Sequence, residues 1–175
     1  MNGLALMSAI GALSACPALA YAEKISLHDR MAIIDTITDI AAGADRHQWE
    51  RVRGAFADKV TLDYTSLWGG EPVTQPAEEV VTQWSGFLPG FDETLHLLSN
   101  CTIVDSGDGA AVAEADFQAL HRIDQDRWSL MGHYRYELTR IDGAWKVTHL
   151  VMRHSFESGD RGLVGRAAAR AGRIR

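Results

Sequence analysis

The chain has 175 residues, 46% of them hydrophobic, and a formal net charge of −6. This length and apolar content predict one globular domain with a sizeable core. Five of the 17 basic residues lie in 161–175, which holds no acidic residue, so the rest of the chain carries 12 basic against 23 acidic side chains. An acidic body argues against nucleic acid as the main partner, and the basic segment predicts a flexible, solvated tail over 158–175.

Residues 1–22 resemble a secretory signal peptide. An apolar run, Leu4–Leu13, precedes Ala20-Tyr21-Ala22, which fits an A-x-A cleavage site. The run is too short to span a bilayer, so stable membrane insertion is not expected. Two alternatives remain open: a bacterial lipobox that would lipidate Cys16, or a start site that is never used. With a working signal the protein is expected to be exported, periplasmic or secreted, and otherwise cytoplasmic.

Capping residues and apolar spacing predict three helices in the first half of the chain. Ser26 can cap the first helix, whose buried face repeats every three or four residues: Ile33, Ile37, Ile40 and Ala44. Asp45 falls on the stripe beside that face and is therefore expected to point inward. The second helix is expected over Trp49–Phe56, and the third begins at Pro76 and is closed by Pro89.

Strands dominate the rest of the chain. A short strand is predicted over Val60–Tyr64, and four long ones follow the third helix: Leu95–Val104, Ala111–Ile123, Trp128–Ile141 and Trp145–Phe156. The segments between the long strands are rich in Asp and Gly, which is typical of hairpin turns. Helices followed by a meander of long strands indicate an α+β fold, in which a curved sheet packs onto the helices. The domain is expected over 23–157.

Four ionisable or hydroxyl-bearing side chains are predicted to meet inside this fold. Asp45 ends the inward stripe of the first helix, and His96 lies in an apolar strand. Strand alternation turns Tyr64 and His121 toward the interior. A buried charge is costly unless it is paired, and a carboxylate that meets an imidazole removes this cost and creates a general base. A single buried histidine is usually a core residue bonded to a carbonyl, but four converging groups favour a site.

Four segments of the chain resemble the scytalone dehydratase-like lyases of the SnoaL-like family, in the nuclear-transport-factor-2-like superfamily. They are Ala-Asp-Arg-His-Gln-Trp-Glu-Arg-Val-Arg, Val-Thr-Leu-Asp-Tyr-Thr-Ser, Glu-Thr-Leu-His and Ile-Asp-Gly-Ala-Trp-Lys-Val. The resemblance implies a cone-shaped α+β barrel of three helices on a strongly curved mixed or antiparallel sheet. It implies an Asp45–His96 catalytic pair, a carbonyl-polarising Tyr64, a second histidine at His121, and no cofactor.

The chain also departs from that family. Ala44 stands where the family has a second tyrosine, and Gly132 and Tyr134 stand where it has a serine and an asparagine. These changes argue against scytalone itself as the substrate. Tyr134 is a candidate for replacing a missing hydroxyl in substrate binding, and Trp68, beside two glycines, is a candidate for gating the pocket.

The expected function is elimination of water, or of another HX, from a small, mostly apolar cyclic substrate. Asp45 would orient His96, His96 would abstract a proton, Tyr64 would bind the oxyanion, and His121 would help protonate the leaving group. Isomerase, cyclase or epoxide hydrolase chemistry is the alternative, but Glu114 and Asp116, the carboxylates it could use, are predicted to face outward. A second alternative is a non-catalytic ligand-binding module. No metal-ligand pairing or phosphate loop is present in the sequence, and an exposed sheet face predicts a homodimer or homotrimer.

Overall fold

The computed structural model describes residues 25–174, so the predicted signal peptide lies outside the described residues. Six strands form one curved sheet in the order β2-β1-β6-β5-β4-β3. Their bounds are β1 Phe56–Asp63, β2 Val73–Pro76, β3 Glu93–Gly107, β4 Ala110–Ile123, β5 Asp126–Ile141 and β6 Ala144–Gly159. Strands β1 and β6 are parallel and the other neighbours antiparallel, which makes the sheet mixed.

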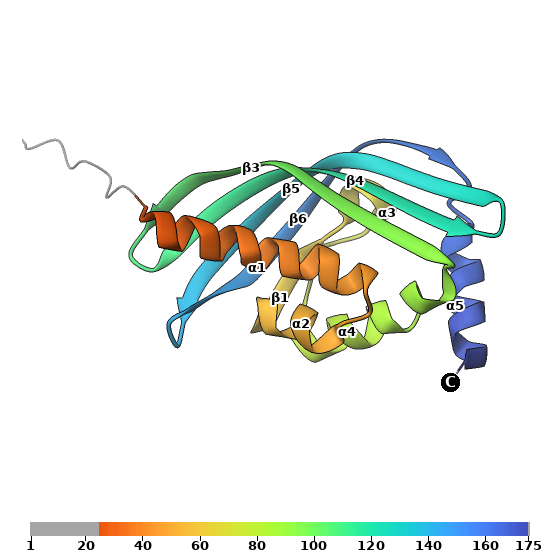
Figure 1. Ribbon diagram of the computed structural model, residues 1–175, viewed down its shortest axis with the longest axis horizontal. Coiled ribbons are helices and arrows are strands. Elements are labelled where there is room, and N and C mark those ends of the chain that lie inside the picture. Colours follow the sequence, from red (N-terminus) through yellow and green to blue (C-terminus); the bar gives the residue numbers. More distant parts are fainter. Residues whose placement is uncertain (1–24, 175) are drawn as a thin grey trace, which may run out of the picture.

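The sheet arches over α1, α2 and α4, while α5 stands at one end of it (Figure 1). The helices are α1 Leu27–Asp45, α2 Trp49–Ala55, α3 Thr65–Trp68, α4 Ala77–Ser85 and α5 Leu163–Ile174, with a 3₁₀ turn, η1, at Leu88–Gly90. The three predicted helices correspond to α1, α2 and α4, and the predicted α+β class is confirmed. Ser26 caps α1 as expected, because its hydroxyl accepts the Asp29 N–H.

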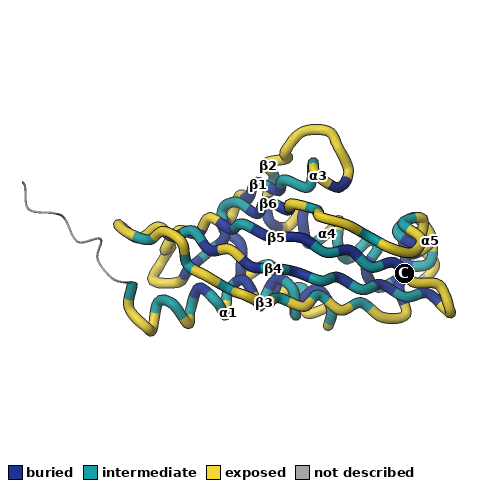
Figure 2. Tube along the Cα trace, turned by 90° about the horizontal axis from the view of Figure 1, so that it is seen from above, coloured by how far each residue is buried: buried dark blue, intermediate teal, exposed yellow. Residues whose placement is uncertain are grey.

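Alternation along the long strands separates the core from the outer face of the sheet (Figure 2). In β4 every second residue from Ala111 to Ile123 is buried, and His121 belongs to that buried set. The hairpins after β3 and β5 turn through Asp108-Gly109 and Asp142-Gly143, all four at positive φ, which suits the right-handed twist of the strands. The antiparallel meander of long strands that the sequence predicted is therefore present.

The prediction of a flexible tail over 158–175 is wrong for most of that range, because residues 163–174 form the helix α5. Leu163, Ala167 and Ala171 recur every four residues and are buried, so the segment carries an apolar stripe between its arginines. Gly90 lets α5 pack closely, since a Cβ there would overlap the backbone of Ala167. The basic composition of this segment predicts a solvated tail, but the four-residue spacing of its small apolar residues gives it a helical face that packs against the domain.

Smaller differences concern the segment between β1 and α4. Tyr64 was expected inside the first strand, yet it follows β1 and is the N-cap residue of α3. Phe56, expected on the second helix, is the buried first residue of β1. Neither α3 nor the edge strand β2 was predicted. No helix within residues 25–174 is long and apolar enough to cross a membrane.

Candidate active site

Asp45 and His96 form a close pair between the last residue of α1 and an inward position of β3. Asp45 Oδ1 lies 2.6 Å from His96 Nδ1, and Asp45 Oδ2 accepts the backbone N–H of His96 at 2.7 Å. The Thr94 hydroxyl donates to Asp45 Oδ1 at 2.9 Å. One carboxylate thus fixes both the ring and the backbone of the histidine. Sequence reasoning missed Thr94, although it lies two residues before His96 and therefore on the same face of the strand.

The charge of Asp45 determines which ring nitrogen of neutral His96 carries the hydrogen. Burial would raise the pKa of Asp45, but hydrogen bonds from His96 and Thr94 and the charge of His96 outweigh it, so the pKa lies below its usual value. The carboxylate is therefore ionised near neutral pH and accepts the Nδ1 hydrogen of His96. In the neutral ring Nε2 is then unprotonated, which makes it the atom that can accept a proton.

His121 lies beside this pair, with its ring edge-on to that of His96 at a centroid distance of 5.4 Å. It is stacked on Trp128 at 4.7 Å and also contacts Phe91. His121 Nδ1 is 3.3 Å from the carbonyl oxygen of Trp128. Burial, followed by the charge of His96, lowers the pKa of His121 to about 3.

This pKa does not fit the proton-donor role expected of His121. The ring is neutral near pH 7, and the Trp128 carbonyl can only accept, so the single ring hydrogen is on Nδ1. Nε2 of His121 is consequently an acceptor. Among the described residues no hydrogen bond is made by Nε2 of either ring, so His96 and His121, which both line the cavity, can each act as an acceptor rather than as one base and one acid.

A cavity of about 280 Å³ lies over these histidines and is mostly apolar. Helix α1 contributes Ala44, which leaves open the space of a larger side chain, and α5 contributes Val164. The full lining is Ile40, Ala41, Ala44, Tyr64, Leu67, Trp68, Gln83, Trp84, Phe87, Leu88, His96, Ala119, His121, Trp128, Leu130, Tyr134, Tyr136, Leu150, Met152 and Val164. No Asp, Glu, Lys or Arg is in this lining, so the cavity suits a small neutral ligand.

Three tyrosines line the cavity, two of them predicted and one not. Tyr64 and Tyr134 are present as expected, and Tyr136 joins them because it lies two residues beyond Tyr134 on β5 and shares its face. Tyr134 is 7% exposed and Tyr136 1%. Burial raises the pKa of each of the three phenols, so all are protonated donors at neutral pH.

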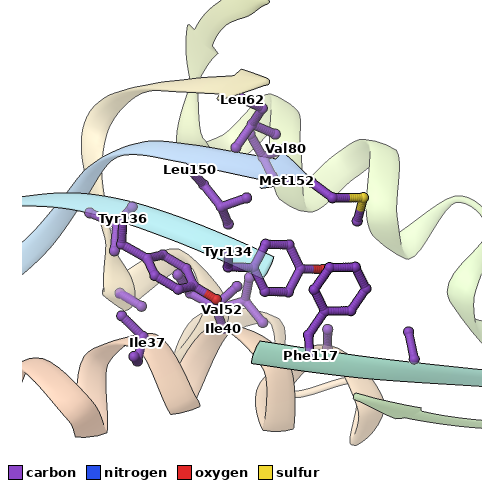
Figure 3. Packing of buried hydrophobic residues seen from close by; sticks show 14 of the residues in the cluster. Ile37, Ile40, Val52, Leu62, Val80, Phe117, Tyr134, Tyr136, Leu150 and Met152 are labelled. Atoms are coloured by element: carbon purple, nitrogen blue, oxygen red, sulfur yellow. The ribbon is translucent and has the colours of Figure 1, made fainter. Parts of the chain in front are cut away.

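Gly132 allows Tyr134 to take its position. The Tyr134 ring stacks on Phe117 with a centroid distance of 4.2 Å, and Figure 3 shows the two rings side by side. A Cβ on Gly132 would be 3.0 Å from Phe117 Cε1 and would overlap the backbone of Arg153. A side chain at position 132 would therefore disturb the stacking of Tyr134 on Phe117.

Trp68 lies at the rim of the cavity on α3 and is 52% exposed. Its ring is 6.1 Å from that of Trp128 and is covered by the guanidinium of Arg161 at 5.2 Å. Arg161 also pairs with Glu157 at 2.6 Å and donates to the Leu67 carbonyl. Glu157 in turn accepts the indole N–H of Trp128 at 2.9 Å. One ion pair next to α5 thus contacts both the exposed Trp68 at the rim and the buried Trp128.

The strand carboxylates lie outside the cavity. Glu114 pairs with Arg135, and Asp116 contacts His133 and Asn100, all on the outer face of the sheet. The outward orientation predicted for these two carboxylates is therefore correct. Among residues 25–174, no three His, Cys, Asp or Glu side chains are grouped so that they could hold a metal ion.

The sequence matches the SnoaL-like domain over residues 26–151. Scytalone dehydratase arp1 from Aspergillus fumigatus is 25% identical over 137 residues, which cover 72% of this chain and 82% of that protein.

Solved structures share the fold. The Kfla4162 protein from Kribbella flavida has a TM-score of 0.68 and 22% identity, covering 83% of this chain and 97% of that one. The hexachlorocyclohexane dehydrochlorinase LinA-type3 from Novosphingobium barchaimii has a TM-score of 0.63 and 21% identity, and the match covers 78% of this chain and 92% of that one. Because the domain match spans well over half of the sequence, the chain belongs to the SnoaL-like family of the nuclear-transport-factor-2-like superfamily.

Proposed function

We propose that the protein is a cofactor-independent lyase that eliminates water, or another HX, from a small, neutral, largely apolar cyclic substrate. The observation that carries the proposal is the part-buried Asp45–His96 pair, whose histidine belongs to the lining of an apolar cavity. The similarity to a scytalone dehydratase and to the dehydrochlorinase fold supports elimination over other chemistry.

In the proposed reaction His96 Nε2 takes a proton from the carbon next to an activating group. The electron pair of that C–H bond becomes the new double bond, and the leaving group departs with the electrons of its own bond to carbon. Asp45 stabilises the imidazolium that forms. A departing hydroxide takes the proton from His96 and leaves as water, whereas a halide leaves as the anion and His96 returns its proton to solvent.

The remaining polar groups bind the substrate. Tyr64 is proposed to donate to the oxygen on which negative charge develops, a role worth about 10²–10³ in rate for a well-placed donor. His121, neutral and protonated on Nδ1, is proposed to accept a hydrogen bond from a substrate hydroxyl instead of supplying a proton. Trp68 is proposed to gate the rim of the cavity.

The alternative of an isomerase or epoxide hydrolase has less support. Those reactions would draw on strand carboxylates inside the cavity, and Glu114 and Asp116 lie on the other face of the sheet. An isomerase that uses His96 alone, returning the proton to a different carbon, is distinguished by its product, which keeps every atom of the substrate.

The test uses cyclic β-hydroxyketones such as 3-hydroxycyclohexanone, whose dehydration gives a conjugated enone that absorbs in the ultraviolet. We expect turnover by the wild-type protein and a loss of about 10²–10⁴-fold in His96→Ala, the range for a positioned proton transfer. His133→Ala is the matched control, because His133 also contacts an aspartate but lies on the outer face. Near-normal activity of a folded His96→Ala variant, or a bound substrate recovered unchanged, would overturn the proposal.

A further inference from the structure

Tyr134 and Tyr136 bring two hydroxyl groups into the interior that the fold itself does not use. Both extend inward from β5 (Figure 3), and both line the cavity. Their rings are neighbours, with centroids 5.7 Å apart. Within the described part of the chain, neither hydroxyl forms a hydrogen bond to a protein atom, and the same holds for the phenol of Tyr64 in the same lining, whereas the Thr94 hydroxyl is bonded to Asp45.

Neither hydroxyl is sealed inside the packed core, because within residues 25–174 the one fully buried side-chain nitrogen or oxygen without a partner is His154 Nε2, so only the cavity can supply a partner for these phenols. Leaving a buried donor unsatisfied costs about 1–3 kcal/mol, and phenylalanine would fill almost the same space without that cost. Packing therefore explains the two rings but not their oxygens. Because both tyrosines belong to the lining of the cavity, a ligand that accepts hydrogen bonds would satisfy their hydroxyls.

The position of Tyr134 ties this pair of phenols to the proposed reaction centre. Its ring is held on Phe117, on the strand that pairs with β3 beside His96. Tyr134 and His96 also line the same cavity, so one ligand can contact both. Tyr136 lies one step farther along the same face of β5.

We propose that Tyr134 and Tyr136 form a donor subsite that binds an oxygen acceptor of the substrate, and that the substrate is therefore a neutral oxygenated ring compound. The inference rests on the proposed function and narrows it. The acceptor is a carbonyl, ether or hydroxyl oxygen, because both phenols are protonated donors and the cavity lining holds no Lys or Arg to balance an anion. A halogenated hydrocarbon without oxygen would leave both hydroxyls unpaired.

The test compares two ligands that cannot react, the bicyclic ketone 1-tetralone and its hydrocarbon counterpart tetralin, by calorimetry or ligand-observed NMR. We expect the wild-type protein to bind the ketone more tightly than the hydrocarbon. Tyr134→Phe or Tyr136→Phe should weaken ketone binding by about five- to tenfold, the value of one net hydrogen bond, and leave hydrocarbon binding unchanged. Met152→Leu changes the cavity wall at a side chain that has no hydrogen-bond donor, so it should change the affinities for ketone and hydrocarbon by the same factor.

Thermal unfolding gives a second, independent measurement. Because neither hydroxyl has a protein partner, both Tyr→Phe variants should unfold at the wild-type temperature or above it. Equal affinity of the wild-type protein for ketone and hydrocarbon, or a ketone affinity that neither variant changes, would overturn the subsite. Since no turnover is involved, this result is independent of the activity of His96→Ala, which tests the proposed reaction.

Discussion

The Thr94 hydroxyl donates to the same oxygen of Asp45 that accepts the ring N–H of His96. Asp45 thereby receives three hydrogen bonds, two of them from His96 itself. Thr94 and His96 are alternate residues of β3, so the strand presents the base and the residue that orients its partner together. The carboxylate can remain ionised at a side-chain exposure of only 10% because these donors replace water.

Replacing Thr94 tests its positioning role. We expect Thr94→Val, which keeps the shape, to lower kcat by about five- to tenfold through loss of one hydrogen bond to the carboxylate, with KM little changed. Thr94→Ser keeps the hydroxyl and should recover most of the activity. Steady-state kinetics of both variants measure this difference. Equal activity of the Thr94→Val and Thr94→Ser variants would contradict a positioning role for the Thr94 hydroxyl.

The buried neutral state of His121 should make stability depend on pH. The unfolded chain takes up a proton near the ordinary pKa of 6.5, whereas folded His121 does so only at about 3. Between these values the unfolded state binds more protons, so stability falls as the pH falls. The wild-type slope should exceed that of His121→Gln by at most about 1.4 kcal/mol per pH unit.

Urea unfolding at several pH values across this window measures the difference in slope. Met152→Leu serves as the control, because it alters the cavity wall without removing a titratable group. It should keep the wild-type slope. Parallel curves for the wild-type and His121→Gln proteins would show that His121 is not held neutral.

Arg161 should affect substrate binding through Trp68 and Trp128, which both line the cavity. Arg161→Met removes the ion pair with Glu157, which holds the Trp128 indole, and it uncovers the Trp68 ring. We expect KM to rise about two- to fivefold with a smaller change in kcat, since a partly exposed pair contributes little energy. Arg166→Met, which breaks a different α5 ion pair with Asp126, should leave KM unchanged. A fall in kcat alone would contradict this view.

Docking of α5 should depend on Gly90. A Cβ at this position would overlap the backbone of Ala167, so Gly90→Ala should push α5 away and cost about 1–3 kcal/mol of folding stability. Gly165→Ala, within α5 itself, meets nothing within 4 Å and should be neutral or stabilising. Thermal unfolding and limited proteolysis of the C-terminal segment compare the two, and a wild-type melting temperature for Gly90→Ala would be inconsistent with close packing.

Much of the fold could be predicted because its signals are local. The four-residue spacing of Ile33 and Ile37, the Ser26 cap and the Asp-Gly turns depend only on neighbours in the chain. Strand alternation likewise turned His121 inward and Glu114 outward. The inward orientation of Asp45 could be predicted from its position beside the buried face of α1. Its contact with His96 could be predicted because two part-buried polar groups are stabilised when they pair.

The sequence alone therefore determined the fold class, the alternation of the strands and the Asp45–His96 pair. Only the tertiary structure decided the lowered pKa of His121, the place of Tyr136 in the cavity lining and the docking of α5 against Gly90. The physical reason is that these properties depend on which atoms from distant segments come close. His121 meets the Trp128 carbonyl, Tyr136 faces the cavity, and Gly90 meets the Ala167 backbone. Local patterns predict which side of an element is buried, but not what it meets there.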